Sequence, residues 1–298
     1  MRIALAANQA SGGGLEPEPL LEALRRHGAE VELFGCQGDE LARLVESRPD
    51  RVVVAGGDGT IGPAAAAAGE LDVPLALLPT GTANDFARAN ELPDDLDEAA
   101  ELAATGELLR SLELGMLADG RPFVNVASAG LAARAARHAS PFKRFLGPLA
   151  YGVGAMQAAV LEAPLDCTVR VDGEEAFSGG AWQVIVAVTG AFGGGSDVGV
   201  SDAGDGVLDV AVLPAGSRIA LTRRAWGLRR GTITEQGPVL HRRGHVIEIL
   251  LPEDTELNVD GEIRRSGLRR ATAERDAYRL VVPDDATGRV ARRPGPGA

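Results

Sequence analysis

Short apolar runs alternate with helix-like segments in the first third of the chain. The runs are "RIALAA" (2–7), "VELF" (31–34), "RVVVA" (51–55) and "PLALLP" (74–79), each nearly free of polar residues, as strands buried on both faces must be. The segments between them are rich in alanine and leucine and long enough for helices. This alternation predicts a doubly wound parallel sheet, in which ligands bind where strands end and helices begin.

The pattern changes near residue 107. Short apolar runs are then separated by turn dipeptides such as "DG" at 119–120 and 172–173, which predicts a mainly β region of two packed sheets or a flattened barrel. Helical patterns interrupt it at about 144–160 and 217–230. We therefore expect an α/β domain over 1–120, with 276–290 as a candidate addition to it, a β-rich domain over 121–275, and a disordered Pro- and Gly-rich tail over 291–298.

Composition and charge restrict the class of protein. With 30 Lys plus Arg against 42 Asp plus Glu, the formal charge is -12, which argues against general binding to nucleic acid. Cys36 and Cys167 lie far apart and lack the clustering of a disulfide scaffold. The first residues contain too short an apolar run for a signal peptide or a membrane span. We expect a cytoplasmic protein without a transmembrane anchor.

A glycine-rich turn, "GGDGT" (56–60), follows the third apolar run and precedes a helix. Glycines at such a junction let a phosphate approach the backbone amides, and the helix N-terminus adds partial positive charge. Asp58 would repel a bare phosphate, so its presence indicates a divalent cation or a reacting hydroxyl between the two. The alternative is that Asp58 and Thr60 only cap the following helix.

A second turn, "PTGTANDFAR" (79–88), ends the next strand in the same way. Gly81 and Thr82 supply the turn and a hydroxyl, and Asn84 and Asp85 open a helix. Because the carboxyl ends of parallel strands meet at one edge of a sheet, we expect Asp58 and Asp85 to face one cleft.

A third glycine-rich segment, "NQASGGG" (8–14), follows the first strand and could fold over a phosphate, although an ordinary loop has the same composition. The three segments predict a nucleotide site. Its expected residues are Asn8, Ser11, Gly12, Gly56, Gly57, Asp58, Gly59, Thr60, Gly81, Thr82 and Asn84.

These three segments, in this order and spacing, resemble the diacylglycerol kinase catalytic domain shared by bacterial lipid kinases, sphingosine kinases and ceramide kinases. The resemblance continues through "LGPLAY" (146–151), "DGVLDV" (205–210) and "VDGE" (259–262), and so covers nearly the whole chain. "GGDGT" alone is shared with NAD kinases and the phosphofructokinase-like fold. The resemblance thus implies an NAD kinase-like α/β domain followed by a β sandwich domain.

Roles for several residues follow from the resemblance alone. It implies that ATP lies on the glycine-rich turns, that the lipid lies on the side of the β-rich domain, and that Glu262 takes the proton from the lipid hydroxyl. Asp58 and Asp85 match the acidic positions that organise metal and phosphate. A structural magnesium site is implied at Asp205 with the carbonyls of Asp202 and Val207.

The chain also departs from the family pattern. Relatives commonly read "GGDGTxNE", whereas Gly62 and Pro63 stand here in place of Asn and Glu, and Gln9 replaces a usual proline. Pro63 still suits the first turn of a helix. These changes remove polar groups near the expected nucleotide without touching Asp58, Asp85 or Glu262.

The prediction is an ATP- and Mg²⁺-dependent lipid kinase, with diacylglycerol first and sphingoid or other lipid alcohols next as acceptors. The alternatives are an NAD kinase and a nucleotide-binding regulatory module that has lost catalysis. The basic stretch 217–230 would suit transient contact with a membrane surface, or equally a surface helix packed on the β domain. The resemblance also allows a homodimer.

Overall fold

The computed structural model describes residues 1–7, 16–131, 163–192, 196–197, 206–216, 239–253, 255–265 and 270–284. Its helices are α1 (Pro17–Arg26), α2 (Asp39–Ser47), α3 (Asp58–Glu70), α4 (Asp85–Ala89) and α5 (Leu96–Thr105). Its strands are β1 (Arg2–Ala7), β2 (Glu30–Gly35), β3 (Arg51–Gly56), β4 (Leu75–Pro79), β5 (Leu109–Leu117), β6 (Pro122–Phe123), β7 (Val126–Gly130), β8 (Leu165–Val171), β9 (Glu174–Ala187), β10 (Ala191–Phe192), β11 (Ser196–Asp197), β12 (Leu208–Pro214), β13 (Leu240–Gly244), β14 (Val246–Leu250), β15 (Glu256–Val259), β16 (Glu262–Arg265) and β17 (Arg270–Val281).

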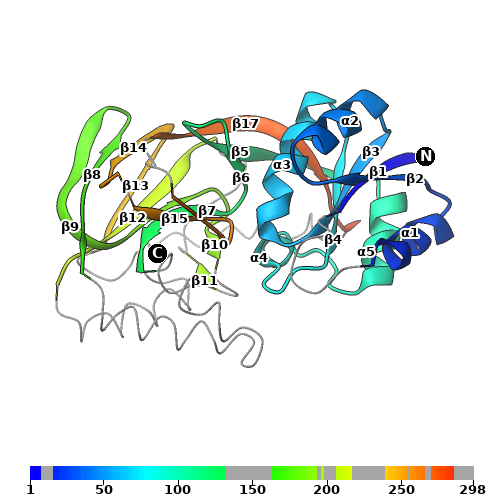
Figure 1. Ribbon diagram of the computed structural model, residues 1–298, viewed down its shortest axis with the longest axis horizontal. Coiled ribbons are helices and arrows are strands. Elements are labelled where there is room, and N and C mark those ends of the chain that lie inside the picture. Colours follow the sequence, from blue (N-terminus) through cyan, green and yellow to red (C-terminus); the bar gives the residue numbers. More distant parts are fainter. Residues whose placement is uncertain are drawn as a thin grey trace, which may run out of the picture.

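The first part of the chain forms the predicted parallel sheet, with helices on both faces (Figure 1). Strands β2, β1, β3 and β4 pair in parallel, in that spatial order. Helices α1 and α5 cover one face over a core that includes Leu24 and Ala100, while α2 and α3 cover the other over Leu44 and Ile61. Nearly all residues of β1, β3 and β4 are buried, which explains their continuous apolar runs in the sequence, whereas β2 at the edge of the sheet is only partly buried.

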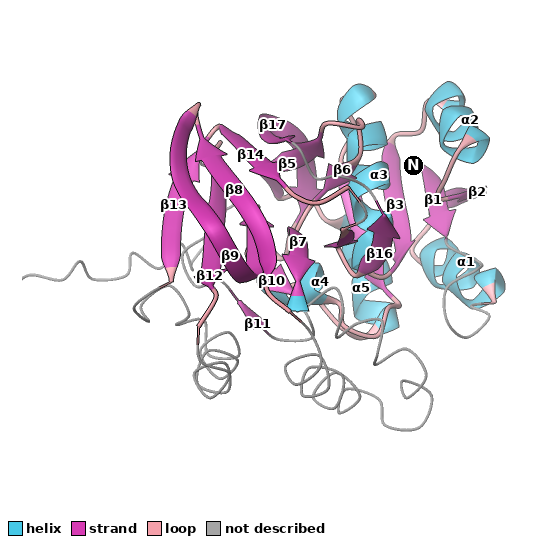
Figure 2. Cartoon of the chain, turned by 60° about the vertical axis from the view of Figure 1, so that its left-hand side comes forward, coloured by secondary structure: helices cyan, strands magenta, loops and turns pink. Residues whose placement is uncertain are grey.

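The second part of the chain is built from antiparallel strands, as its turn-rich pattern predicted (Figure 2). The long strand β9 pairs along its first half with β8, and along its second half with both β7 and β12. Side chains such as Val169, Val186, Val210 and Ile249 form a separate core there. The predicted combination of an α/β domain with a β sandwich domain is therefore confirmed.

Strand β17 connects the two parts. It pairs in parallel with β4, where Leu280 lies opposite Leu75, and antiparallel with β5 and β14 along its length. Hydrogen bonding consequently runs without interruption from the parallel sheet into the β-rich part. The residue limits that we assign to the two domains remain a prediction.

Candidate functional site

Two glycine-rich turns meet at the carboxyl edge of the parallel sheet. Gly57, after β3, and Gly81, after β4, lie so close that a Cβ atom on Gly81 would be 2.5 Å from the α-carbon of Gly57. The amide of Thr80 also donates to the carbonyl of Gly56, at 3.3 Å. Only glycine allows this approach, which brings the predicted segments 56–60 and 81–84 into a single backbone surface.

The hydroxyl groups of the two turns have different surroundings. Thr60 is buried, and its hydroxyl donates to the carbonyl of Gly57 at 2.7 Å, so this side chain shapes the turn. Thr82 is exposed. Asn84 has a positive φ of 48°, and its Oδ1 atom is buried without a hydrogen-bond donor among the described residues. A buried, unpaired oxygen is costly, which indicates a site suited to a bound donor or cation.

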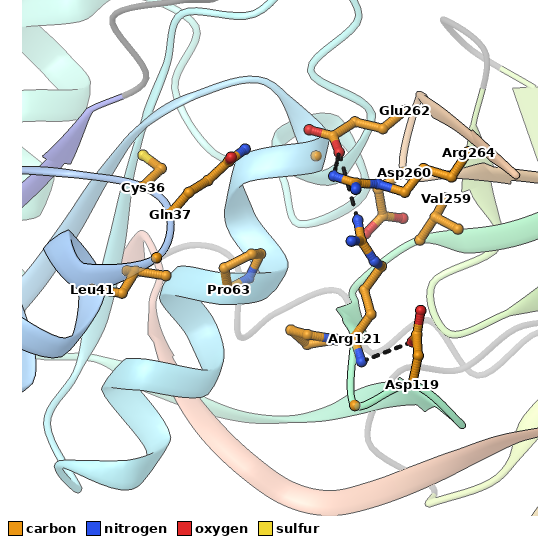
Figure 3. A pocket seen from close by; sticks show the side chains of 14 residues that line it. Cys36, Gln37, Leu41, Pro63, Asp119, Arg121, Val259, Asp260, Glu262 and Arg264 are labelled. Carbon is orange, nitrogen blue, oxygen red and sulfur yellow. Dashed lines mark hydrogen bonds and ion pairs between the residues drawn. The ribbon is translucent and has the colours of Figure 1, made fainter. Parts of the chain in front are cut away.

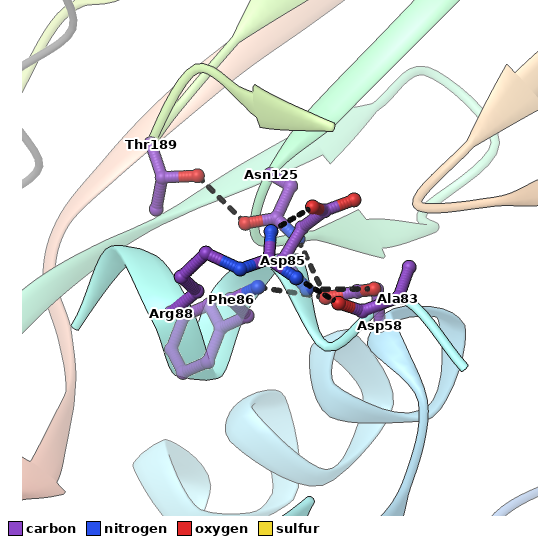
Figure 4. Close-up of polar contacts among 7 residues, drawn as sticks. All are labelled: Asp58, Ala83, Asp85, Phe86, Arg88, Asn125 and Thr189. Carbon is purple, nitrogen blue, oxygen red and sulfur yellow. Dashed lines mark hydrogen bonds and ion pairs between the residues drawn. The ribbon is translucent and has the colours of Figure 1, made fainter. Parts of the chain in front are cut away.

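Asp58 binds the start of α4 and the side chain of Asn125 instead of capping its own helix (Figure 4). Its Oδ1 accepts the amide of Phe86 at 2.8 Å and the side-chain amide of Asn125 at 2.9 Å, and its Oδ2 accepts the amide of Asp85 at 3.2 Å. Asp58 therefore holds the start of α4. The expected proximity of Asp58 to Asp85 is present, since the charge of Asp85 acts on Asp58.

Burial raises the pKa of the Asp58 carboxyl above its usual value, and the charge of Asp85 acts in the same direction. The amide of Phe86 and the side chain of Asn125 oppose this shift by donating to the carboxylate. Asp85 itself is buried and pairs with Arg88 at 2.7 Å. Two carboxylates are thus kept close together at the carboxyl edge of the parallel sheet, which is typical of sites that bind a divalent cation.

The "VDGE" motif forms a tight hairpin between β15 and β16. Asp260 and Gly261 both have positive φ, and Gly261 donates to the Oδ1 of Asn258 at 2.8 Å. This is the hairpin that an Asp-Gly pair favours. Its two acidic residues have different environments: Asp260 is buried, whereas Glu262 faces a pocket between the two parts of the chain.

Asp260 binds three consecutive backbone amides. Its Oδ2 accepts from Val124 at 2.7 Å, and its Oδ1 accepts from Asn125 and Val126 at 2.9 Å each. Burial raises the pKa of Asp260 to about 7, although these three amides act in the opposite direction. Asp260 thereby fixes the segment that carries Asn125 toward Asp58. The sequence did not reveal this role, because a buried aspartate in a turn looks like any other Asp-Gly pair.

Glu262 lies against the first turn of α3. A Cβ atom on Gly59 would be 2.8 Å from Cγ of Glu262 and 3.0 Å from its Oε1. The Oε2 of Glu262 pairs with Arg264 at 2.7 Å and with Arg121 at 3.7 Å (Figure 3). A carboxylate from the β-rich part thus meets the glycine-rich turn of the α/β part, as required if both act on one substrate.

Several predicted residues fall outside the described ranges. Asn8, Ser11 and Gly12 of the first glycine-rich segment do so, as do Asp202 and Asp205 of the expected magnesium site, the stretch 217–230 and the tail 291–298. Val207 is described, at the start of the segment that leads into β12. Within the described ranges, no three His, Cys, Asp or Glu side chains gather closely enough to form a metal site by themselves.

Comparison with known proteins extends over both parts of the chain. Residues 2–117 match the diacylglycerol kinase catalytic domain family, and residues 125–282 match the YegS C-terminal NAD kinase beta sandwich-like domain family. The chain is 28% identical to a diacylglycerol kinase of Bacillus subtilis over 88% of its length and 89% of the relative's. It is 32% identical to a probable YegS-like lipid kinase of Pseudomonas putida over 82% and 80% of the two chains.

Solved structures share the fold. A crystal structure of a diacylglycerol kinase from Bacillus anthracis superposes with a TM-score of 0.75 at 20% identity, covering 95% of this chain and 97% of that one. An NAD kinase from Archaeoglobus fulgidus, solved in complex with ATP, gives a TM-score of 0.53 at 17% identity, covering 97% of each chain. The NAD kinase-like architecture expected from "GGDGT" is confirmed at the level of the fold.

Proposed function

Because the chain belongs to the diacylglycerol kinase and YegS-like lipid kinase family, we propose that it transfers the γ-phosphate of ATP to a lipid hydroxyl. Diacylglycerol is the first acceptor in this proposal, and sphingoid or other lipid alcohols come next. The observation that carries it is the contact of Glu262 with Gly59, which sets a carboxylate beside a phosphate-binding type of turn.

The phosphates of ATP would lie on the combined surface of the two glycine-rich turns. Gly57 and Gly81 have no side chains that would cover this surface. The N-terminus of α3 directs partial positive charge toward it. Phosphoryl transfer depends mainly on positioning and on neutralising charge, so backbone amides can supply much of the catalysis.

The described residues fit a magnesium ion at the same edge. Asp58 and Asp85 supply carboxylate oxygens close together, and the buried Oδ1 of Asn84 has no hydrogen-bond donor among the described residues. Mg²⁺ is commonly held by one or two carboxylates together with substrate phosphates. When bound, the ion would neutralise charge on the phosphates, and the site does not need a third carboxylate for that purpose.

Glu262 would accept the proton of the lipid hydroxyl. The hydroxyl oxygen forms a bond to the γ-phosphorus, the bond from that phosphorus to the bridging oxygen breaks, and ADP leaves. The proton of the hydroxyl moves to Glu262, which is half-exposed and reachable from the pocket. The lipid would approach Glu262 from the side of the β-rich part.

Gly62 and Pro63 do not by themselves argue for a chain without catalysis. A Cβ atom on Gly62 would lie 2.8 Å from the carbonyl oxygen of Pro122, so a larger residue here would force α3 and β6 to move apart. The change at Gly62 therefore has a packing explanation. The expectation for Pro63 was wrong, because α3 begins at Asp58 and Pro63 lies inside the helix, beyond its first turn. Contact with a membrane surface is part of the proposal; no helix in the described part of the chain is long and apolar enough to cross a membrane.

The test is transfer of labelled γ-phosphate from ATP with Mg²⁺ to diacylglycerol, sphingosine, ceramide or a total lipid extract in detergent micelles. A parallel reaction contains NAD in place of lipid. Label in a lipid supports the proposal and identifies the acceptor class. Label only in NADP would replace it with the NAD kinase alternative, and ATP binding without any transfer would favour the regulatory module.

A further inference from the structure

A pocket of about 410 Å³ adjoins the turn at Gly59 (Figure 3). The α/β part contributes the start of α2 and the side of α3 at Pro63, and the β-rich part contributes the turn between β5 and β6 and the β15–β16 hairpin. Arg121 comes from the first of these two β-rich elements and Arg264 from the second. The pocket therefore lies beside the site described above and continues it toward β6.

The two arginines use only part of their hydrogen-bonding capacity. Their terminal nitrogens share one oxygen of Glu262, Arg264 at 2.7 Å and Arg121 at 3.7 Å. The Nε atoms of both arginines are buried and find no acceptor among the described residues. A guanidinium group has five N–H donors in one plane, an arrangement that matches an anion with several oxygens. One shared carboxylate oxygen therefore leaves several N–H donors of Arg121 and Arg264 without an acceptor among the described residues.

In the described part of the chain, nearby carboxylates do not take up the remaining donors. Asp260 lines the pocket, but its oxygens already accept the amides of Val124, Asn125 and Val126. Asp119 accepts the backbone amide of Arg121 at 3.1 Å from an exposed position. The side chains of Arg121 and Arg264 are 29% and 40% exposed, so a ligand in the pocket can reach both.

We propose that Arg121 and Arg264 form an anion subsite that binds a phosphate group of a substrate beside Gly59. This inference rests on the proposed kinase function and names two further binding residues for it. Glu262 holds both guanidinium groups toward the pocket, and the N-terminus of α3 adds partial positive charge at the same place. The phosphate belongs either to the nucleotide or to the headgroup of an acidic lipid.

Direct binding tests the subsite without relying on turnover. Isothermal titration calorimetry of the full chain with ATP and with inorganic tripolyphosphate compares the wild type with Arg264→Gln and Arg121→Gln. Arg170→Gln, at an exposed position on β8 outside the pocket, is the matched control. We expect about tenfold weaker binding for the two pocket variants, because a charge-assisted hydrogen bond is lost, and no change for the control.

A second arm identifies the source of the phosphate. Co-sedimentation with micelles containing phosphatidic acid, against micelles of neutral diacylglycerol, measures binding to an acidic headgroup. Loss of that preference in both pocket variants, with ATP and tripolyphosphate binding intact, assigns the subsite to the lipid. If neither arm changes by more than about twofold, the proposal is overturned.

The Glu262→Gln background separates direct binding from a charge effect. If Arg264 only neutralises Glu262, then Arg264→Gln will have no effect on anion binding once Glu262 is uncharged, and the proposal fails. If Arg264 contacts the phosphate, the weakening persists in that background. These binding results stand even if the wild-type chain phosphorylates no lipid, so failure of the kinase proposal and failure of the subsite can be told apart.

Discussion

Asn125 donates its side-chain amide to Asp58, with 2.9 Å between Nδ2 and Oδ1, and so connects the β-rich part of the chain to the candidate nucleotide site. The orientation of this amide is fixed, because its Oδ1 accepts the hydroxyl of Thr189 at 2.6 Å. Its backbone is held as well, by Asp260 and by the amide of Val188. Asn125 is therefore a positioning residue for Asp58.

Replacing Asn125 with leucine should shift the pH dependence of activity. Burial already raises the pKa of Asp58, and loss of a donor to its carboxylate raises it further. If ionised Asp58 is required, activity is lost as the pH falls through this pKa, so the acidic limb of kcat/KM should move to higher pH. Thr189→Val should give a smaller shift in the same direction. An acidic limb that stays in place or moves down would contradict this role.

Replacing Asp260 with asparagine should lower stability by about 2 kcal/mol, because the amide group introduced would face a backbone N–H donor. The free energy of unfolding of this variant should also lose the part of its pH dependence that comes from Asp260. The pKa of Asp260 is raised from 3.8 to about 7, so between these values the folded state retains a proton that the unfolded state has released. Stability from this group is thus full at low pH and falls as the pH rises toward 7.

Denaturant unfolding at several pH values, for the wild type and Asp260→Asn, checks both statements. The difference in unfolding free energy between the two should be largest at acidic pH. Equal stabilities at every pH would mean that Asp260 does not hold the segment around Asn125.

Gly62→Ala should destabilise the fold. The new methyl group would lie 2.8 Å from the carbonyl oxygen of Pro122, a backbone atom that cannot rotate away. Overpacking of this kind costs about 1–3 kcal/mol, although alanine is favoured over glycine in a helix by about 1 kcal/mol. Thermal unfolding measures the net effect, and a variant more stable than the wild type would show that α3 and β6 are not in close contact.

Gly59→Ala should reduce activity while stability changes little. Here the methyl group meets the side chain of Glu262, 2.8 Å from Cγ, and this flexible side chain can move aside. Moving it displaces the proposed base, so kcat should fall by about tenfold or more. The same preparation is compared with the wild type by thermal unfolding, and wild-type kcat would contradict the importance of this contact.

Much of the fold could be predicted because its signals are local. Continuous apolar runs identified the parallel strands, and the glycine-rich segments after β3 and β4 were expected to meet because parallel strands end at one edge. The antiparallel part followed from its turn dipeptides, such as Asp172-Gly173, where both residues have positive φ.

The contacts that complete the site could not be predicted in the same way. Asn125 lies within "RPFVNVAS", which looks like a single strand, yet the structure has separate strands β6 and β7 there because Asp260 binds the amides of Val124, Asn125 and Val126. The partners are more than a hundred residues apart in the chain, and no local pattern indicates the pairing. Arg121 likewise reaches Glu262 only in the folded chain, because the two residues belong to turns that are far apart in the sequence.

The most direct test of the central claim compares phosphate transfer by the wild type and by Glu262→Gln, using diacylglycerol micelles, ATP and Mg²⁺. Calorimetric ATP binding and thermal unfolding of the same preparations control for folding and for the nucleotide site. We predict that kcat falls by about 100-fold or more while ATP affinity and unfolding temperature stay close to those of the wild type. Turnover equal to the wild type in Glu262→Gln would contradict the account and remove this carboxylate from the reaction.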